Sequence, residues 1–291
     1  MRDFAKRIKI LAVTGPTATG KTALAVELAK EFDGEIVSVD SRQVYRGMDI
    51  GSGKDIGEYG EVPYHLIDVA QPGKEVYNLS RFCKDAYAAI DDISARGKLP
   101  VLCGGTALYL HALLQGYELP GGALAPRQPG VERVRQSGTE NSFQPPFALE
   151  PLVLGVLYPR RTVRERIEKR LDARFEQGMI GEIQQLHDAA GVTWEQLEFF
   201  GLEYREIARY LQNLCTFEEM RTTLLNRIRQ FAKRQDIFFR KMEREGVIIH
   251  WLKLARIPEP RTLIRDFLAG KALPPPEFRL CDFTNPPAWK Q

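Results

Sequence analysis

With 291 residues, 44% of them hydrophobic and 27% charged, the chain has the composition of a globular protein large enough to bury a substantial core. The net charge of +3 is too small to indicate a nucleic-acid-binding protein by itself, so any basic surface must come from local clustering. No apolar run predicts a membrane span, no signal peptide is evident, and the four cysteines are too far apart for a zinc site or a disulfide framework. We therefore expect a cytoplasmic protein with reduced thiols and no membrane partner.

The first element in the chain is a glycine-rich loop between an expected strand, residues 8–13, and an expected helix, residues 23–32. Residues 15–22 read Gly-Pro-Thr-Ala-Thr-Gly-Lys-Thr and match the pattern G-x4-G-K-[ST]. In such a loop backbone N–H groups surround phosphate oxygens, Lys21 supplies a positive charge, and the Thr22 hydroxyl can hold Mg²⁺. The sequence predicts a phosphate or diphosphate site, and leaves the compound and the reaction open.

Two further strand ends should meet this loop. A strand over residues 35–40 places Asp40 at its carboxyl end, where open α/β sheets bind ligands, and the polar stretch 41–54 suits a loop that lines a cleft. After a short strand over 63–69 and a helix over 79–95, a strand over 99–103 ends in Gly104-Gly105-Thr106 before a helix over 107–114. We expect both glycine turns to face one cleft.

The remaining segments divide the chain. Residues 1–115 and 151–200 form an α/β core, the second part with a strand over 152–157 and a helix from Thr162 on which Arg166 and Arg170 lie one turn apart. Residues 116–150, rich in Gly, Pro, Gln and Ser, predict a flexible connection with at most a short helix near Val131. Residues 256–291 form a tail with a helix over 261–268 and a poorly ordered end.

In residues 201–255, the spacing of apolar residues predicts helices over 203–211 and 217–245 and a last strand over 247–252. The longer helix carries the one basic cluster, interleaved with phenylalanines: Arg227, Arg229, Lys233, Arg234, Arg240 and Lys241, with Phe231, Phe238 and Phe239. This composition could bind phosphates and stack on bases, or it could be a solvated basic face over a phenylalanine core. In total we expect an α/β fold with a P-loop NTPase-like parallel sheet flanked by helices, and a mainly helical C-terminal region.

Seven motifs occur in the order found in one family. They are the loop at 15–22, D-S-R-Q-V-Y at 40–45, G-S-G-K at 51–54, P-Y-H-L-I-D at 63–68, G-G-T-A-L-Y at 104–109, G-L-E-Y-R-E at 201–206 and A-K-R-Q at 232–235. Over residues 8–252 the chain resembles the tRNA dimethylallyltransferases. The resemblance implies transfer of a dimethylallyl group from dimethylallyl diphosphate to N6 of adenosine 37, beside the anticodon of tRNA.

The resemblance also implies roles for individual residues. Asp40 would accept a proton from, or bind, the exocyclic amine, while Lys21, Thr106 and Arg170 draw charge from the diphosphate and Thr22 helps to hold Mg²⁺. Other implied diphosphate ligands are Gly15, Thr17, Ala18, Thr19, Gly20 and Arg166. The implied contacts with the tRNA anticodon stem-loop come from Asp40, Ser41, Arg42, Gln43, Arg229, Lys233, Arg234 and Gln235. We expect a monomer.

Each role has a plainer alternative. Asp40 could only bind water on a magnesium ion, Thr106 could be a helix cap, and Arg170 could be a surface arginine. His65, with no metal-ligating partner nearby in the sequence, is better explained as a packed or hydrogen-bonding residue than as a catalyst. Lys54 could be merely solvated.

The sequence departs from the family at one place. The helical insertion that bacterial members carry before the strand at 152 is largely missing, so its contacts with RNA do not carry over. This absence favours an adenylate isopentenyltransferase acting on free AMP, ADP or ATP, whereas the basic helix favours tRNA. A small-molecule kinase and a nucleotide- or RNA-binding protein without turnover are further alternatives.

Overall fold

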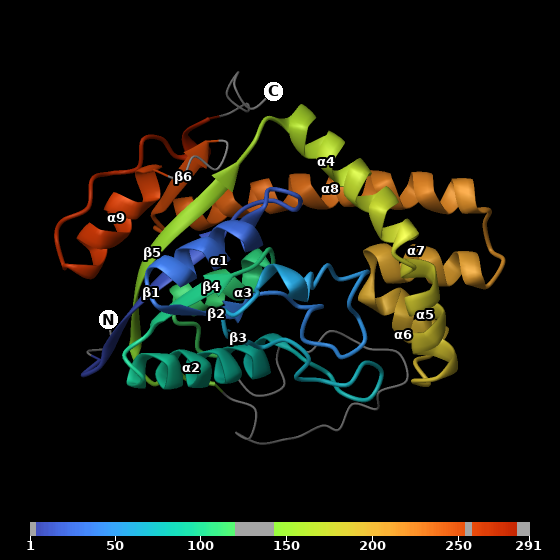
Figure 1. The fold of residues 1–291 in the computed structure, drawn as a ribbon, viewed down its shortest axis with the longest axis horizontal. Helices are drawn as coiled ribbons and strands as arrows, with labels where there is room; N and C mark the ends of the chain where they lie inside the picture. The colour runs from blue at the N-terminus through green and yellow to red at the C-terminus, as the bar shows by residue number, and fades with distance from the viewer. Residues whose placement is uncertain (1–3, 120–142, 254–257, 284–291) are drawn as a thin grey trace.

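The computed structural model describes residues 4–119, 143–253 and 258–283. In this part of the chain six parallel strands form one sheet in the order β3-β2-β4-β1-β5-β6 (Figure 1). Their bounds are β1 (Arg7–Thr14), β2 (Gly34–Ser38), β3 (Tyr64–His65), β4 (Leu99–Cys103), β5 (Ala148–Leu157) and β6 (Ile249–Lys253). The central strands are continuously apolar because both faces of the sheet are covered, as is typical of parallel sheets.

Helices cover the two faces of the sheet. Leu11 and Val13 of β1 pack in one cluster with α1 (Lys21–Glu31) and α9 (Pro258–Leu268). The alternate residues, Ile10 and Ala12, belong to the cluster on the other face, which contains α2 (Leu79–Ala95), α3 (Ala107–Leu114) and α8 (Phe217–Arg244). Because successive side chains of β1 point to opposite faces of the sheet, this one strand contributes residues to both cores.

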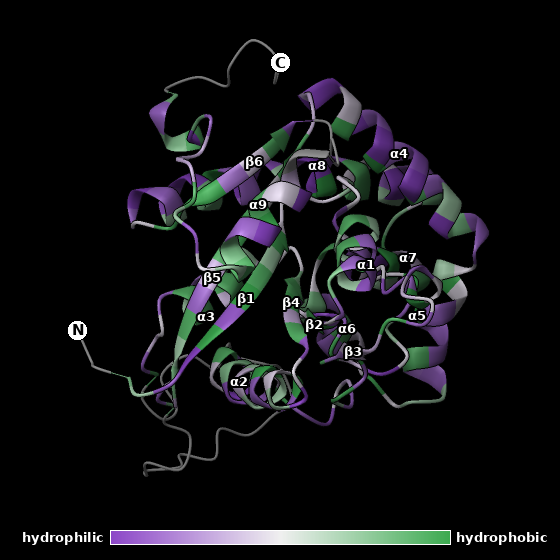
Figure 2. Ribbon diagram, turned by 60° about the vertical axis from the view of Figure 1, so that its left-hand side comes forward, coloured by the Kyte–Doolittle hydropathy of each residue, from purple (hydrophilic) through white to green (hydrophobic). Residues whose placement is uncertain are grey.

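A helical layer lies beyond the carboxyl ends of the strands (Figure 1). It contains α4 (Arg160–Glu176), α5 (Met179–Asp188), α6 (Trp194–Phe200) and α7 (Leu202–Leu211), and α8 runs from this layer back to the sheet. Figure 2 shows that α4 is mostly hydrophilic, since only one stripe, Val163, Ile167 and Leu171, is buried along with Arg174. The helix therefore leaves most of its surface for polar contacts with solvent and with the site.

The topology positions the ligand site. β1 pairs with β4 on one side and with β5 on the other. The strands that follow β1 as far as β4 lie on one side of it, and β5 and β6 lie on the other, so the order of the strands reverses beside β1. Ligands of open α/β sheets bind at the carboxyl edge near such a point. The loop after β1, the segment after β2 and the turn after β4 all leave the sheet at this edge.

Most expected elements are confirmed, with the strand over 63–69 as an exception. Only Tyr64 and His65 form a strand there, because Leu66 and Asp68 adopt left-handed φ angles of 63° and 56° that end the extended backbone. The chain then forms an isolated bridge between Ala70 and Tyr45. Helices α5 and α6 were not predicted. Two short 3₁₀ turns complete the described elements, Ile56–Glu58 and Leu280–Asp282.

The C-terminal segment differs from the expectation as far as residue 283. Leu280 is fully buried against α8, and the backbone N–H groups of Leu280 and Cys281 donate to the carboxylate of Glu243 at 3.1 and 2.8 Å. The predicted poor order is therefore wrong for this part of the tail. The short helix expected near Val131 lies outside the described residues, and the predicted division of the chain into segments stays a prediction.

All four cysteines are free thiols, as expected. No helix in the described ranges is long and apolar enough to cross a membrane.

Candidate active site

A cavity of about 970 Å³ opens at the carboxyl edge of the sheet. Its walls come from the loop after β1, the segment after β2, the turn after β4, and helices α4, α7 and α8. Among the predicted site residues it brings together Thr17, Ala18, Gly20, Lys21, Thr22, Asp40, Ser41, Arg42, Gln43, Thr106, Arg166, Arg170, Arg234 and Gln235. The predicted convergence of the two glycine turns on one cleft is confirmed.

The phosphate-binding loop has a backbone that glycine makes possible. Gly20 has a φ of 77°, and a Cβ on Gly15 would lie 2.5 Å from the carbonyl oxygen of Val156. Thr19 is 1% exposed and donates its hydroxyl to the Pro16 carbonyl oxygen at 2.8 Å, so its side chain shapes the loop from inside. Within the described ranges no side chain caps the N-terminus of α1, which leaves its first N–H groups available to an anion.

Two cationic side chains, Lys21 and Arg170, lie at this loop. Burial lowers the pKa of Lys21 to about 8, and the charge of Arg170 lowers it further, against the opposing influence of Asp40 and Cys103. Burial also lowers the pKa of Arg170 to about 10, helped by the charge of Arg174. Arg170 donates from Nη2 to Oγ1 of Thr17 at 2.5 Å. Burial thus disfavours the charged form of both side chains, so a bound diphosphate would stabilise them.

Asp40 lines the same cavity as this loop and interacts electrostatically with Lys21. Burial raises the pKa of its carboxyl group, although the backbone N–H groups of Arg42 and Gln43 donate to Oδ1 at 2.8 and 3.4 Å and lower it in part. A carboxylate with a raised pKa is a better base than an exposed aspartate. The two bonds also fix the direction in which the carboxyl group points.

Thr106 joins the second glycine turn to the segment after Asp40. It occupies the N-cap position of α3, but its hydroxyl makes no capping bond; instead Oγ1 accepts a hydrogen bond from the Ser41 N–H at 3.1 Å. The close approach needs Gly104, because a Cβ there would lie 2.1 Å from the Val39 carbonyl oxygen. The helix-cap explanation of this side chain is therefore wrong.

Gln235 connects the two glycine turns. Its Oε1 accepts from the Thr17 N–H and its Nε2 donates to the Gly105 carbonyl oxygen, each at 2.8 Å, and the side chain is 5% exposed. Both ends of the amide thus bind this chain, while the contact with RNA stays a prediction. No local pattern could have predicted this bridge, since 218 residues separate Gln235 from Thr17.

The basic helix α8 divides into two parts. Arg229 donates to Glu168 of α4 at 2.9 Å, and Arg227 lies 3.0 Å from Glu206 of α7, so acids from neighbouring helices offset both. Lys233 and Arg234 are exposed, and the Arg234 guanidinium lies 5.9 Å from the ring centre of Phe231. Arg229 and Lys233 do not line the cavity. One part of the basic cluster is thus paired with acids and another part is exposed, while the contact of this helix with RNA stays a prediction.

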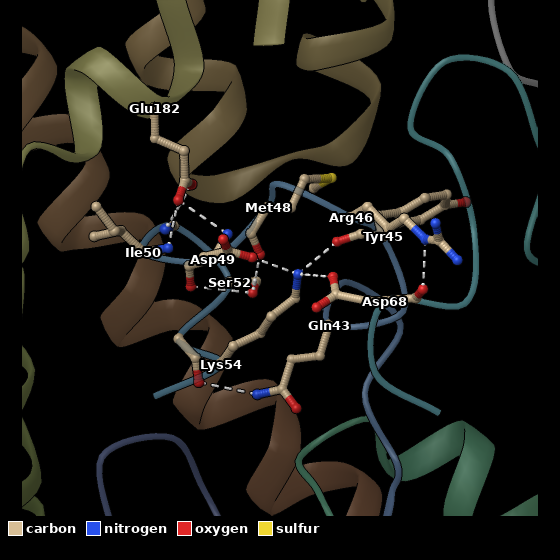
Figure 3. A network of polar contacts seen from close by, with 12 residues as sticks. Gln43, Tyr45, Arg46, Met48, Asp49, Ile50, Ser52, Lys54, Asp68 and Glu182 are labelled. Atoms are coloured by element: carbon tan, nitrogen blue, oxygen red, sulfur yellow. Dashed lines mark hydrogen bonds and ion pairs between the residues drawn. The ribbon is translucent and has the colours of Figure 1, made fainter. Parts of the chain in front are cut away.

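The loop after β2 is held in place by two sets of polar contacts, made by Lys54 and by Glu182 (Figure 3). Lys54 is 1% exposed and its Nζ binds the Tyr45 carbonyl oxygen, Asp49 and Asp68 at 2.5 to 2.6 Å, so the expectation of a solvated lysine is wrong. Glu182 of α5 accepts the N–H groups of three consecutive residues, Asp49, Ile50 and Gly51, at 2.9, 2.5 and 3.0 Å.

Gly51, Ser52 and Gly53 of this loop line the cavity, and Gln43 ties the loop to β2. Gln43 donates from Nε2 to the Gly53 carbonyl oxygen at 2.9 Å and accepts from Ser38 at 2.8 Å. His65 lies 2.8 Å from Glu35, which confirms the prediction of a hydrogen-bonding residue.

The sequence-based prediction missed a third arginine of α4. Arg174 follows Arg166 and Arg170 at the same spacing of four residues, and all three line the cavity. Arg166 stacks over Tyr158 with its guanidinium carbon 3.9 Å from the ring centre. The spacing along α4 was a signal that could have found Arg174.

Comparison with known proteins identifies the family. The family model described as IPP transferase matches residues 43–145 and 128–242 of this chain. The chain belongs to the IPP transferase family. A second model, described as isopentenyl transferase, matches residues 8–59, which hold the phosphate-binding loop and Asp40. Both models therefore cover segments that line the cavity.

Individual relatives cover most of the chain. It is 45% identical over 289 residues to tRNA dimethylallyltransferase 2 of Trichlorobacter lovleyi, which covers 86% of this chain and 93% of that protein. It is 44% identical over 284 residues to tRNA dimethylallyltransferase 1 of Geotalea daltonii, with 86% and 92% covered. Among solved structures, the tRNA isopentenylpyrophosphate transferase of Bacillus halodurans is 29% identical with a TM-score of 0.72, covering 90% of this chain and 96% of that one.

Proposed function

We propose that this family member transfers a dimethylallyl group from dimethylallyl diphosphate to N6 of adenosine 37 in tRNA, releasing diphosphate. The observation that carries the proposal is the shared cavity, which is lined both by a glycine-rich loop with two cations and by the Asp40 carboxylate. We take the acceptor, tRNA, and the transferred dimethylallyl group from the name of the relatives, tRNA dimethylallyltransferase.

The donor half of the site would stabilise a leaving diphosphate. As the allylic C1–O bond breaks, negative charge develops on the diphosphate, so donors fixed beforehand at that position lower the barrier. Lys21, Arg170 and the uncapped N–H groups of α1 supply this positive potential. Thr106, whose hydroxyl the Ser41 N–H already orients, adds a neutral donor at the second turn.

The acceptor half would position adenine for attack. The N6 amine is a poor nucleophile, so orientation relative to C1 contributes much of the rate. Asp40, oriented by the backbone of Arg42 and Gln43, would accept the proton that N6 loses as the C–N bond forms. The raised pKa of Asp40 suits this role, since it makes the carboxylate a stronger base.

The donor set fits a magnesium ion held largely by the substrate. Thr22 and Asp40 present a hydroxyl and a carboxylate to the same cavity, and the described residues contain no cluster of three or more His, Cys, Asp or Glu side chains that could hold a metal by itself. Mg²⁺ commonly binds through one or two protein oxygens, substrate phosphates and water. We propose that Thr22 holds it, where it would neutralise charge on the diphosphate.

Transfer to a free adenine nucleotide and phosphate transfer from ATP are less well supported. The exposed cations Lys233 and Arg234 extend the positive charge of the cavity along α8, as an RNA backbone would require and a free nucleotide would not. The matched relatives are named as tRNA enzymes.

One experiment separates these functions. The protein is incubated with labelled dimethylallyl diphosphate, Mg²⁺ and either tRNA or AMP, with a parallel reaction in ATP. We expect label in tRNA at adenosine 37. Label in AMP alone, phosphate transfer from ATP, or binding without product would each contradict the proposal and identify the corresponding alternative.

A further inference from the structure

The cavity contains an arginine and a glutamate that the proposed transfer reaction does not use. Arg174 of α4 is 6% exposed and Glu203 of α7 is 8% exposed, and both line the cavity. Arg174 Nη1 lies 3.7 Å from Glu203 Oε1, which is an ion pair without a close hydrogen bond. A buried pair of this kind costs desolvation, so its presence beside a substrate site calls for a functional reason.

Arg174 is fixed close to the anion site. It lies one helical turn beyond Arg170, and its charge lowers the pKa of Arg170. On the other side it packs against the backbone of Gly53, where a Cβ would lie 1.9 Å from Nη2. The guanidinium of Arg174 thus lies in close contact with the loop that carries Gly53.

Glu203 faces both the cations and the catalytic carboxylate. Burial raises the pKa of its carboxyl group, while the charges of Arg174 and Arg170 lower it and that of Asp40 raises it. The ionised form thus offsets the charge of Arg174 inside the cavity. Without ionised Glu203, Arg174 would be a buried cation with no compensating charge. An uncompensated buried cation attracts any anion that can reach it.

We propose that Glu203 confines the anion site to the phosphate-binding loop by neutralising Arg174. The departing diphosphate then meets Lys21 and Arg170 without the charge of Arg174 to retain it. Fast product release matters because this step limits turnover in many enzymes. The inference rests on the proposed transfer reaction, of which diphosphate is the product.

The test is the affinity for diphosphate in the absence of RNA, measured by titration calorimetry with Mg²⁺ present. The substitution Glu203→Gln should tighten binding by about tenfold or more, as expected for one uncompensated charge near the ligand. Inhibition of turnover by added diphosphate should increase by the same factor, and kcat should fall. The matched control Glu195→Gln, at an exposed position of α6, should change neither quantity.

A double variant separates this role from a structural one. Arg174→Met with Glu203→Gln replaces the charged pair by an uncharged pair, so the diphosphate affinity should return to within about threefold of the original protein. If Glu203→Gln does not fold, Arg174→Met alone should leave the diphosphate affinity within about threefold of the original, because a neutralised Arg174 adds no charge to the anion site and an unpaired buried Glu203 takes up a proton.

Unchanged diphosphate affinity in folded Glu203→Gln would overturn the proposal, as would weaker binding in Arg174→Met or tight binding that persists in the double variant. A purely structural pair would lower the melting temperature and leave the inhibition by diphosphate unchanged. Failure of the proposed function looks different: the unmodified protein would bind diphosphate but prenylate no tRNA.

Discussion

At the scale of single residues, the site combines a carboxylate and a lysine whose pKa values are shifted in opposite directions. Asp40 has a pKa above that of an exposed aspartate because of its burial, and Lys21 has a pKa of about 8 for the same reason. Such opposite shifts are typical of catalytic groups. Their directions lead to two predictions on how activity depends on pH.

The first prediction concerns Asp40. Asp40→Asn keeps the shape and the bonds from the backbone but removes the base, so kcat should fall by about 10²- to 10⁴-fold with the melting temperature nearly unchanged. In the unmodified protein activity should decline on acidification at a higher pH than an exposed aspartate would give, because protonated Asp40 cannot accept the N6 proton. A pH–rate profile tests this, and a variant with near-normal kcat would falsify the assignment.

The second prediction concerns Lys21. As the pH rises through its pKa of about 8, Lys21 loses its proton and the loop loses one positive charge, so KM for the diphosphate donor should increase. Arg170, with a pKa of about 10, stays charged over this interval. Lys21→Arg should remove the pH dependence of this KM, because the introduced guanidinium group remains protonated. A donor KM that stays constant on raising the pH well above 8 contradicts the prediction.

At the scale of elements, the loop 48–54 depends on a helix outside the sheet. Glu182 accepts three backbone N–H groups of this loop and also binds the Tyr204 hydroxyl at 3.3 Å. Each hydrogen bond to a charged group contributes about 1.5–3 kcal/mol. Helix α5 therefore positions one wall of the cavity without touching a substrate.

A third prediction tests this anchor. Glu182→Gln puts an amide NH₂ group against N–H donors, so the variant should lose about 2–3 kcal/mol of stability to unfolding. Amide hydrogen exchange in residues 48–54 should become faster, and KM for tRNA should increase more than KM for the donor. Asp188→Asn, the same change at an exposed position of α5, is the control. Exchange rates equal to those of the control would show that the loop holds its shape without Glu182.

The sequence predicted those elements and residues whose signals are local. The spacing of apolar residues predicted α2 and β4 to the residue, and the glycine pattern predicted a loop that the structure places at the cavity. Helix α5 carries the same kind of signal in Met179, Ile183 and Leu186, and could have been predicted. The roles of Glu182, Gln235 and Glu203 could not, because their partners lie in other segments and only the packing of the helical layer on the sheet brings them together.

At the scale of the whole molecule, the net charge of +3 conceals an uneven distribution. Cationic side chains of α4 and α8 line the cavity. Acidic side chains of α7 and α4 form ion pairs with two arginines of α8. Long-range attraction of a polyanion follows such local clusters rather than the total.

A fourth prediction tests this distribution. Reversing the charges of the exposed residues, Lys233→Glu with Arg234→Glu, should weaken tRNA binding and reduce the slope of log K against log salt by about 1 for each phosphate that is no longer neutralised. Lys84→Glu on α2, away from the cavity, is the control for total charge. Arg229→Glu should act mainly through stability, because it breaks the pair with Glu168. Equal salt slopes in the double variant and the control would assign the basic helix to solvent alone.

The bridge made by Gln235 has a consequence for how the protein comes into being on the ribosome. The loop that contains Thr17 is translated well before Gln235, whose amide ties Thr17 to Gly105 and follows more than two hundred residues later. A nascent or truncated chain that stops before α8 would carry the whole loop in its sequence and still lack the finished pocket. The walls of the cavity are thus complete only after α8 has been synthesised.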